Sequence, residues 1–397
     1  MAAARERGFE YGAPDWANLG QGAPETGEIP DGAERVERIT MDARTCEYAP
    51  VAGLWEMREA VADLYNARYR RGMGSRYSAE NVAIAAGGRT ALTRLATAMG
   101  PVHLGHLLPD YTAYEELLDA FRRFVPIPIL LQRDEGFRLT PGRFREIGVG
   151  TGLGALLLSN PSNPTGQLIA GEDLRRLVGV SRELGCALVV DEFYAHYVYD
   201  RGEGATVSAA EYVEDVDEDA VVVVDGLTKN WRYPGWRLSW TVGPKSVIER
   251  VTSAGSFLDG GAPHAPQHAA LPLVSKAFAD REARAIQAHF RGKRDMMLSR
   301  LESMGFVIPG RPEGAFYCFA DLSNLPPSLR DGMDFFRAAL ERKVVTVPGE
   351  FFDVDPGKRR RHISSRLKSF VRLSFGPERA ELERGLDGIE AMIAEAR

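Results

Sequence analysis

The chain has 397 residues, of which 44% are hydrophobic and 26% charged, and its formal net charge is −6 at pH 7. This length and balance are typical of a soluble globular protein with two lobes, and the lack of a dense basic face argues against nucleic acid as the main partner. No apolar run approaches the roughly 20 residues that cross a bilayer, so we expect no membrane partner. Nor does an apolar region follow the first charges, so we expect no secretory signal. The scattered cysteines Cys46, Cys186 and Cys318 suit a reducing cytoplasm and argue against structural zinc, and no metal is expected.

The middle of the chain alternates short apolar runs with helical periodicity. Strands are expected at 82–85, 155–158, 187–190 and 220–224. A helix is expected at 172–184, where apolar side chains recur on one face. Because the strand runs are apolar at consecutive positions and rich in β-branched residues, they indicate strands buried on both faces of a mostly parallel sheet. The sequence therefore predicts an α/β fold in which helices cover a central sheet.

The pattern changes after about residue 280, where a long, charged, amphipathic helix is expected to run to residue 304. The elements expected after it are strands at 315–320, 343–347 and 370–375 and helices at 332–342 and 378–396. This mixture predicts a second, smaller α+β lobe. We therefore expect a large domain at 46–280 and a small domain that combines 281–397 with an N-terminal arm at 1–45.

Polar residues and glycines follow the expected strands at the point where each strand ends. Asn163 follows one strand, Asp191 ends another and Lys229 follows a third. Gly87 and Gly88 close a fourth strand and open a helix. In a doubly wound sheet, ligands bind just beyond the carboxyl ends of the strands. We therefore expect these residues to face a common site.

These residue types match the needs of pyridoxal 5'-phosphate (PLP). Its aldehyde forms a Schiff base with a lysine amine, and its ring nitrogen stays protonated beside a buried carboxylate. Its phosphate favours helix N-terminal amides and a cation, and its 3'-oxygen favours neutral donors such as Asn and Tyr. The chain carries the set in order: Gly-Gly before a helix, Asn-Pro-Thr-Gly at 163–166, Asp-x-x-Tyr at 191–194, Lys229, and Arg237 eight positions later. We predict that Lys229 carries PLP.

Over nearly its whole length, the chain resembles the class I/II aminotransferases of PLP fold type I, which are aspartate aminotransferase-like. The strings that carry the resemblance include Gly-Gly-Arg-Thr-Ala-Leu at 87–92, Asn-Pro-Ser-Asn-Pro-Thr-Gly at 160–166, Gly-Leu-Thr-Lys at 226–229 and Arg-Leu-Ser-Phe at 372–375. The fold that the resemblance implies is α/β, with a large domain around a mostly parallel sheet and a smaller α+β domain. The catalytic residues that it implies are Lys229, Asp191 and Tyr194.

The resemblance also implies how each residue binds the cofactor. Asp191 would pair with the ring nitrogen, and Asn163 and Tyr194 would hydrogen-bond the 3'-oxygen. Tyr111 would stack on the ring. The phosphate would be held by Gly87, Gly88, Arg89 (mainly through its backbone amide) and Arg237.

Further matches concern the substrate and a partner subunit. The substrate would contact Asn163, Gly22 in the string Leu-Gly-Gln-Gly-Ala-Pro at 19–24, and Arg372, which would grip the α-carboxylate. Tyr48 matches a tyrosine that reaches the phosphate of the neighbouring subunit. The resemblance therefore implies a homodimer.

The activity that the resemblance implies is transfer of an amino group between an α-amino acid and a 2-oxo acid, and the cysteine pattern favours a cytoplasmic location. An alternative on the same scaffold is a PLP-dependent lyase, cyclase or oxidase of specialised metabolism. A third reading is the effector domain of a transcription factor. It would need a DNA-binding domain ahead of the motifs. Because the motifs begin by Leu19, we do not expect this reading to hold.

The chain departs from the family pattern at Arg232 and Tyr233 and in the long stretch 353–369. One hypothesis is that Arg232 and Tyr233 help define the substrate pocket. The alternative is that Arg232 faces solvent or a partner chain while Tyr233 packs in a dimer interface. If the substrate is a dicarboxylate, the candidates for the second cation are Arg35, Arg38, Arg44 and Arg232.

Overall fold

The computed structural model describes residues 1–121 and 123–397. Its α-helices are α1 Ala2–Arg5, α2 Trp55–Tyr69, α3 Gly88–Ala98, α4 Ala113–Ala120, α5 Pro141–Thr151, α6 Glu172–Leu184, α7 Lys245–Leu258, α8 His264–Ala270, α9 Lys276–Met304, α10 Gly332–Glu341 and α11 Arg379–Glu395. Its strands are β1 Ala17–Asn18, β2 Val82–Ala85, β3 Val102–Leu108, β4 Phe124–Leu130, β5 Ala155–Ser159, β6 Ala187–Asp191, β7 Val221–Gly226, β8 Ser239–Val242, β9 Tyr317–Asp321, β10 Val344–Val345, β11 Val347–Pro348 and β12 Phe370–Ser374.

A seven-stranded sheet in the order β2-β8-β7-β6-β5-β3-β4 forms the larger part of the molecule. All neighbouring strands pair in parallel except β8, which is antiparallel to both β2 and β7. Every residue of β5 and β7 is buried. The prediction of an α/β fold with a mostly parallel, doubly covered sheet is confirmed.

Successive residues of each central strand enter two different cores, because side chains alternate across a strand. In β5, Ala155 and Leu157 pack in the core that contains Leu92 of α3, whereas Leu156 and Leu158 pack in the core that contains Leu174 of α6. Both faces therefore need apolar side chains, which explains the continuous apolar runs in the sequence.

A smaller group of elements combines β1, near the N-terminus, with the elements that follow α9. It contains an antiparallel sheet in the order β11-β12-β9 and a parallel pair formed by β1 and β10. The expectation of one strand at 343–347 is wrong. Val344 and Val345 pair with β1, whereas Val347 and Pro348 pair with β12, so the chain changes sheets at Thr346.

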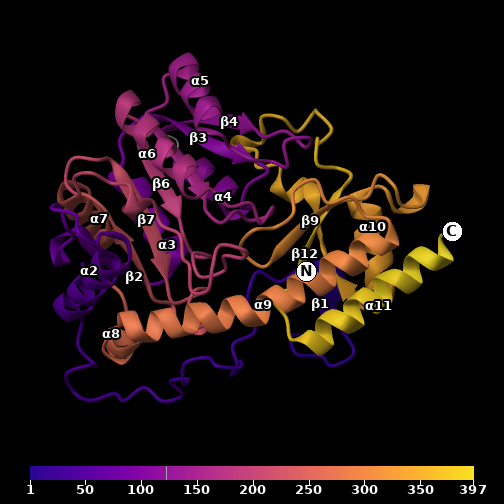
Figure 1. The fold of residues 1–397 in the computed structure, drawn as a ribbon, viewed down its shortest axis with the longest axis horizontal. Helices are drawn as coiled ribbons and strands as arrows, with labels where there is room; N and C mark the ends of the chain where they lie inside the picture. Colours follow the sequence, from indigo (N-terminus) through magenta and orange to yellow (C-terminus); the bar gives the residue numbers. More distant parts are fainter. Residues whose placement is uncertain (122) are drawn as a thin grey trace.

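Helix α9 joins the two groups of elements. It runs from beside α8 to beside α11, and the N-terminal segment before α2 passes along it (Figure 1). It begins at Lys276, a few residues before the expected start, because the Ser275 side chain caps it by accepting from the Phe278 amide. Glu282 and Lys293 are buried on this helix although they carry charge. None of the helices in the described part of the chain combines the length and apolar character that a membrane-spanning helix requires.

The topology brings the polar strand ends to one edge of the sheet. β5, β6 and β7 are adjacent and parallel, so Ser159 and Asp191 end side by side and β7 ends two residues beyond them, at Gly226. β2 runs in the same direction as β7, because β8 is antiparallel to both. The turn at Gly87 and Gly88 therefore opens onto the same edge.

Candidate active site

A cavity of about 420 Å³ lies at this edge of the seven-stranded sheet. Its walls include predicted site residues, namely Gly88, Arg89, Tyr111, Asn163, Asp191, Tyr194, Lys229 and Arg237. They also include residues to which the sequence assigned no role: Leu92, Ser159, Phe193 and Thr228. Side chains that are more than a hundred residues apart in the chain, such as Arg89 and Arg237, thus line one cavity.

Lys229 lies in the turn after β7, which closes where the Arg232 amide donates to the Lys229 carbonyl over 3.0 Å. Its Nζ donates to the carbonyl of Gly22, so the N-terminal segment lies against the amine. Burial, together with repulsion from Arg237 and Arg372, lowers the pKa of Lys229 to about 8. A larger fraction of the amine is therefore neutral near pH 8 than in an exposed lysine.

Asp191 ends β6 and is buried. It accepts a hydrogen bond of 2.8 Å from the Tyr114 hydroxyl and one of 3.3 Å from the Phe193 amide. Burial raises the pKa of Asp191 to about 6, against the opposing effect of these hydrogen bonds and of Lys229. At neutral pH, Asp191 remains an anion in the cavity wall. Sequence reasoning did not single out Tyr114, although it lies one helical turn after Tyr111.

The hydroxyl groups of Tyr194 and Tyr317 are 2.8 Å apart and hydrogen-bonded. Tyr317 belongs to β9 and was not assigned a role from the sequence. Asn163 accepts a hydrogen bond of 2.8 Å from Nη1 of Arg372, which belongs to β12. The smaller group of elements therefore places two polar side chains directly beside those of the larger sheet.

The Arg372 side chain is almost fully buried, with 5% of the residue exposed. Its Nη2 donates to the Gly20 carbonyl over 2.7 Å, and its guanidinium lies over the rings of Tyr317 and Phe352, 4.3 and 4.9 Å from their centroids. Its Nε has no partner among the described residues. Arg372 thus retains a free donor close to the segment that contains Gly22.

One end of the cavity is suited to an anion. Helix α3 begins at Gly88 without a side-chain cap, so its first amides are free to bind a ligand. Gly87 precedes it with φ of +94°, and a Cβ there would lie 2.1 Å from Nη2 of Arg237. The buried hydroxyl of Thr228 has no hydrogen-bond partner in residues 1–121 and 123–397. Amides, a guanidinium and a hydroxyl together fit a phosphate group.

The Arg89 side chain also reaches the cavity, whereas the sequence pointed mainly to its backbone amide. Its side chain is exposed, lines the cavity and donates from Nη2 to the Tyr111 hydroxyl over 3.3 Å. Tyr48, by contrast, is 96% exposed and lies outside the cavity walls. Its expected role is across subunits and stays a prediction.

The alternative that placed Arg232 in solvent or against a partner chain is wrong, whereas the hypothesis that it helps define the substrate pocket stays a prediction. Arg232 faces neither solvent nor the cavity: it is fully buried and donates from Nε to Glu282 of α9 over 2.8 Å. The Arg232 backbone is left-handed, with φ of +58°, and the side chain points into the protein toward α9. Tyr233 is also absent from the cavity walls, and its hydroxyl accepts from the Val36 amide over 2.8 Å.

Two of the four candidate cations for a second substrate carboxylate are therefore engaged within the chain. Arg232 pairs with Glu282, and Arg35 donates to the carbonyls of Trp231 and Arg232 over 2.9 and 2.8 Å. Arg38 and Arg44 are exposed.

Comparison with known proteins identifies the family to which the chain belongs. Residues 14–389 match the family model described as aminotransferase class I and II. The aspartate/prephenate aminotransferase of Thermus thermophilus is 29% identical over 390 residues, which cover 96% of this chain and 92% of that protein. The probable N-acetyl-LL-diaminopimelate aminotransferase of Bacillus subtilis is 27% identical over 376 residues, covering 93% and 87%. The structure of Thermus thermophilus aspartate aminotransferase with maleate matches with a TM-score of 0.79 at 26% identity, over 98% of this chain and 94% of that one. The chain has the fold of type I PLP-dependent enzymes and belongs to the class I and II aminotransferases.

Proposed function

We propose that this aminotransferase uses PLP, held in the cavity beside Lys229, to move an amino group between an α-amino acid and a 2-oxo acid. The observation that carries the proposal is the sharing of one cavity by the Lys229 amine, the buried Asp191 carboxylate and a cluster of phosphate-binding groups at the start of α3. Few ligands other than a phosphorylated, aldehyde-bearing pyridine need all three.

The ring would lie between the polar walls of the cavity. Asp191 would pair with the ring nitrogen, since its carboxylate is ionised at neutral pH. Asn163 and Tyr194 would bind the 3'-oxygen, and Tyr111 would stack on the ring. Tyr114 would hold the Asp191 carboxylate in place through its hydroxyl.

The phosphate would lie at the start of α3. The amides of Gly88 and Arg89 and the guanidinium of Arg237 would bind it, and the free hydroxyl of Thr228 would donate a further hydrogen bond. Gly87 keeps this space open, because it has no side chain to displace Arg237. Tyr48 of the partner subunit would complete the phosphate site.

When bound, PLP supplies an aldehyde that condenses with amines and a ring that delocalises the negative charge developing at the substrate Cα. Lys229 would take the proton from Cα and return it on the other side of the transferred nitrogen, for which a neutral amine is required. Its pKa of about 8 makes that form accessible near neutral pH. Arg372 would bind the substrate α-carboxylate and thereby orient Cα toward Lys229.

The first substrate to test is aspartate, because relatives of this chain are named for it. A second carboxylate needs a second cation. Since Arg35 and Arg232 are engaged, we propose Arg38 or Arg44 of a partner subunit as its source.

We also propose a cytoplasmic homodimer. Tyr48 is 96% exposed, and Met41 and Trp55 on the same stretch of chain are 66% and 53% exposed. A second copy would cover these apolar side chains, and a two-fold pair is the commonest closed assembly. We also propose that residues 46–280 form a large domain and that residues 1–45 and 281–397 form a small one.

The experiment begins with absorbance of the purified protein after incubation with PLP. Borohydride reduction followed by peptide mapping should find the cofactor on the peptide that contains Lys229; labelling of another lysine would overturn the assignment. Turnover of amino acids should then require a 2-oxo acid. Turnover without one would contradict amino-group transfer and favour elimination or oxidation.

A further inference from the structure

Arg232 is a fully buried arginine that lies three residues after Lys229. Its backbone is left-handed, with φ of +58°, a conformation that non-glycine residues seldom adopt. The Arg232 amide closes the turn onto the Lys229 carbonyl. A strained conformation at this place indicates that the contacts of the side chain compensate for it.

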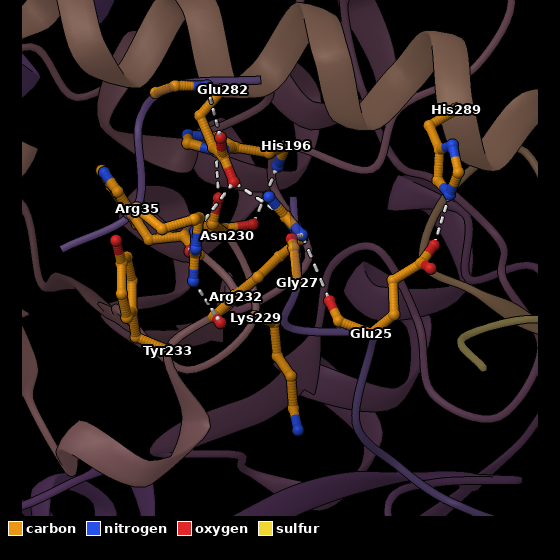
Figure 2. A network of polar contacts seen from close by, with 12 residues as sticks. Glu25, Gly27, Arg35, His196, Lys229, Asn230, Arg232, Tyr233, Glu282 and His289 are labelled. Atoms are coloured by element: carbon orange, nitrogen blue, oxygen red, sulfur yellow. Dashed lines mark hydrogen bonds and ion pairs between the residues drawn. The ribbon is translucent and has the colours of Figure 1, made fainter. Parts of the chain in front are cut away.

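The guanidinium of Arg232 joins three parts of the chain (Figure 2). Nε donates to Glu282 of α9 over 2.8 Å, and the Glu282 side chain is itself fully buried. Nη1 donates to the carbonyls of Gly27 and Glu25 over 2.6 and 3.3 Å. One side chain thus connects the turn at 229–232 (the lysine turn), helix α9 and the N-terminal segment around residues 20–36.

Contacts also run from the N-terminal segment back to the lysine turn. Arg35 donates to the carbonyls of Trp231 and Arg232, and its guanidinium lies 3.6 Å from the ring centroid of Tyr233. The Val36 amide donates to the Tyr233 hydroxyl. The two segments are therefore joined by reciprocal contacts, although about 200 residues of chain separate them.

The same N-terminal segment also contacts two predicted site residues. The Gly22 carbonyl accepts from Lys229, and the Gly20 carbonyl accepts from Arg372. Both contacts use groups that, in the proposed function, must turn to the cofactor and the substrate. The side-chain contacts of Arg232 use no group from the cavity walls, so the proposed function does not require them to break when the other two are released.

We propose that Arg232 is a positioning residue that holds residues 20–27 over the cavity and thereby sets the affinity for substrate. The proposal deepens the proposed function and rests on it for the kinetic consequence. The side-chain contacts of Arg232 with Glu282, Glu25 and Gly27, called the clamp below, can be tested in the absence of turnover.

The test removes the clamp without leaving a buried carboxylate unpaired. Replacing one partner of a buried ion pair is strongly destabilising, whereas replacing both is far less so. We therefore choose the double variant Arg232→Met/Glu282→Gln, in which the glutamine oxygen can still accept from the Ala33 amide. Arg232→Lys is a graded variant that keeps the charge but not the forked geometry.

Arg70→Met is the matched control. Arg70 is also fully buried and donates to backbone carbonyls, among them those of Ala210 and Val213, but it lies outside the cavity walls and the N-terminal segment. It therefore reports the general effect of removing a buried guanidinium.

In the double variant, amide hydrogen exchange in peptides covering residues 20–36 should be faster than in the parent protein. KM for both substrates should rise about tenfold, the size expected for losing one hydrogen bond to a charged group. The kcat and the absorbance of the bound cofactor should stay close to those of the parent enzyme. Arg232→Lys should give an intermediate KM, and Arg70→Met should change neither KM nor exchange in residues 20–36.

Unchanged exchange in residues 20–36 would overturn the proposal, whatever the kinetics. So would a fall in kcat and in cofactor absorbance at constant KM, because Arg232 would then support the lysine turn instead. If the parent protein neither binds PLP nor transfers an amino group, the proposed function fails, and the exchange experiment alone still decides whether the clamp exists.

Discussion

The hydroxyl of Tyr114 donates a hydrogen bond of 2.8 Å to the carboxylate of Asp191, and both side chains are buried. This contact favours the ionised carboxylate, whereas burial opposes it and raises the pKa of Asp191 to about 6. Tyr114 therefore helps to keep a negative charge in the cavity wall at the pH at which the enzyme is expected to work.

Tyr114→Phe should raise the pKa of Asp191 further, because a group that lowers it is lost. Asp191 would then be protonated at a higher pH, so the acidic limb of the pH profile of kcat/KM should move upward. A hydrogen bond of about 1 kcal/mol corresponds to a shift of somewhat less than one pH unit. Tyr111→Phe, which removes a hydroxyl bonded to Arg89 but not to Asp191, is the control. An acidic limb that stays in place in Tyr114→Phe would refute this role.

Gly87→Ala should weaken cofactor binding. The added Cβ would lie 2.1 Å from Nη2 of Arg237, and φ of +94° disfavours alanine. Displacing one charged hydrogen bond to phosphate should cost about 1.5–3 kcal/mol, or roughly a 10- to 100-fold rise in the Kd of PLP. The Kd can be measured by absorbance titration. Gly235→Ala is the control, because nothing lies within 4 Å of its Cβ position, and a similar loss in that variant would contradict the steric argument.

Arg372→Ala should raise KM for the amino acid far more than it changes the Kd of PLP. Removing one partner of a buried, charge-assisted contact typically costs about 3–5 kcal/mol, which corresponds to at least a hundredfold rise in KM. Steady-state kinetics with saturating cofactor and a separate PLP titration distinguish the two effects. A loss of PLP affinity at constant KM would assign Arg372 to the cofactor site.

Glu25→Gln should destabilise the fold in a pH-dependent way. The nearby His289 and Lys293 lower the pKa of Glu25 below 4.5, in spite of burial. A carboxyl group whose pKa is lower in the folded state stabilises the protein above its unfolded pKa, and this contribution is lost as the pH falls through the folded pKa. Since the buried Lys293 ammonium would lose its charged partner and keep only the Gly376 carbonyl, the loss at pH 7 should be about 3 kcal/mol.

Urea unfolding of this variant, measured from pH 7 downward, checks both the size and the sign. The difference from the parent protein should shrink as the pH falls below about 4.5. Glu341→Gln removes the exposed partner of Arg7 and should change little at any pH. A difference in Glu25→Gln that is constant with pH would show that packing, not charge, is responsible.

Local sequence patterns were sufficient for the architecture and for much of the cavity wall. Continuous apolar runs identified β5, β6 and β7, and topology makes the carboxyl ends of parallel strands meet, so Asp191 and Lys229 could be expected to face one site. The split of 343–347 between two sheets could not be read in this way. Its four paired residues are apolar, and only the strands β1 and β12, far away in the chain, decide which pairs with which.

The sequence by itself determined the residue types at the strand ends, because the chemistry of an amine, a carboxylate and a glycine turn is local to each motif. Only the tertiary structure decided where Arg232 points. Sequence reasoning placed it in solvent, against a partner chain or at the substrate pocket, but Glu282 lies 50 residues later and Gly27 205 residues earlier, and both contact its guanidinium. Side-chain direction depends on the backbone angle at Arg232 and on which distant segments pack against it, and neither is encoded within the motif around Lys229.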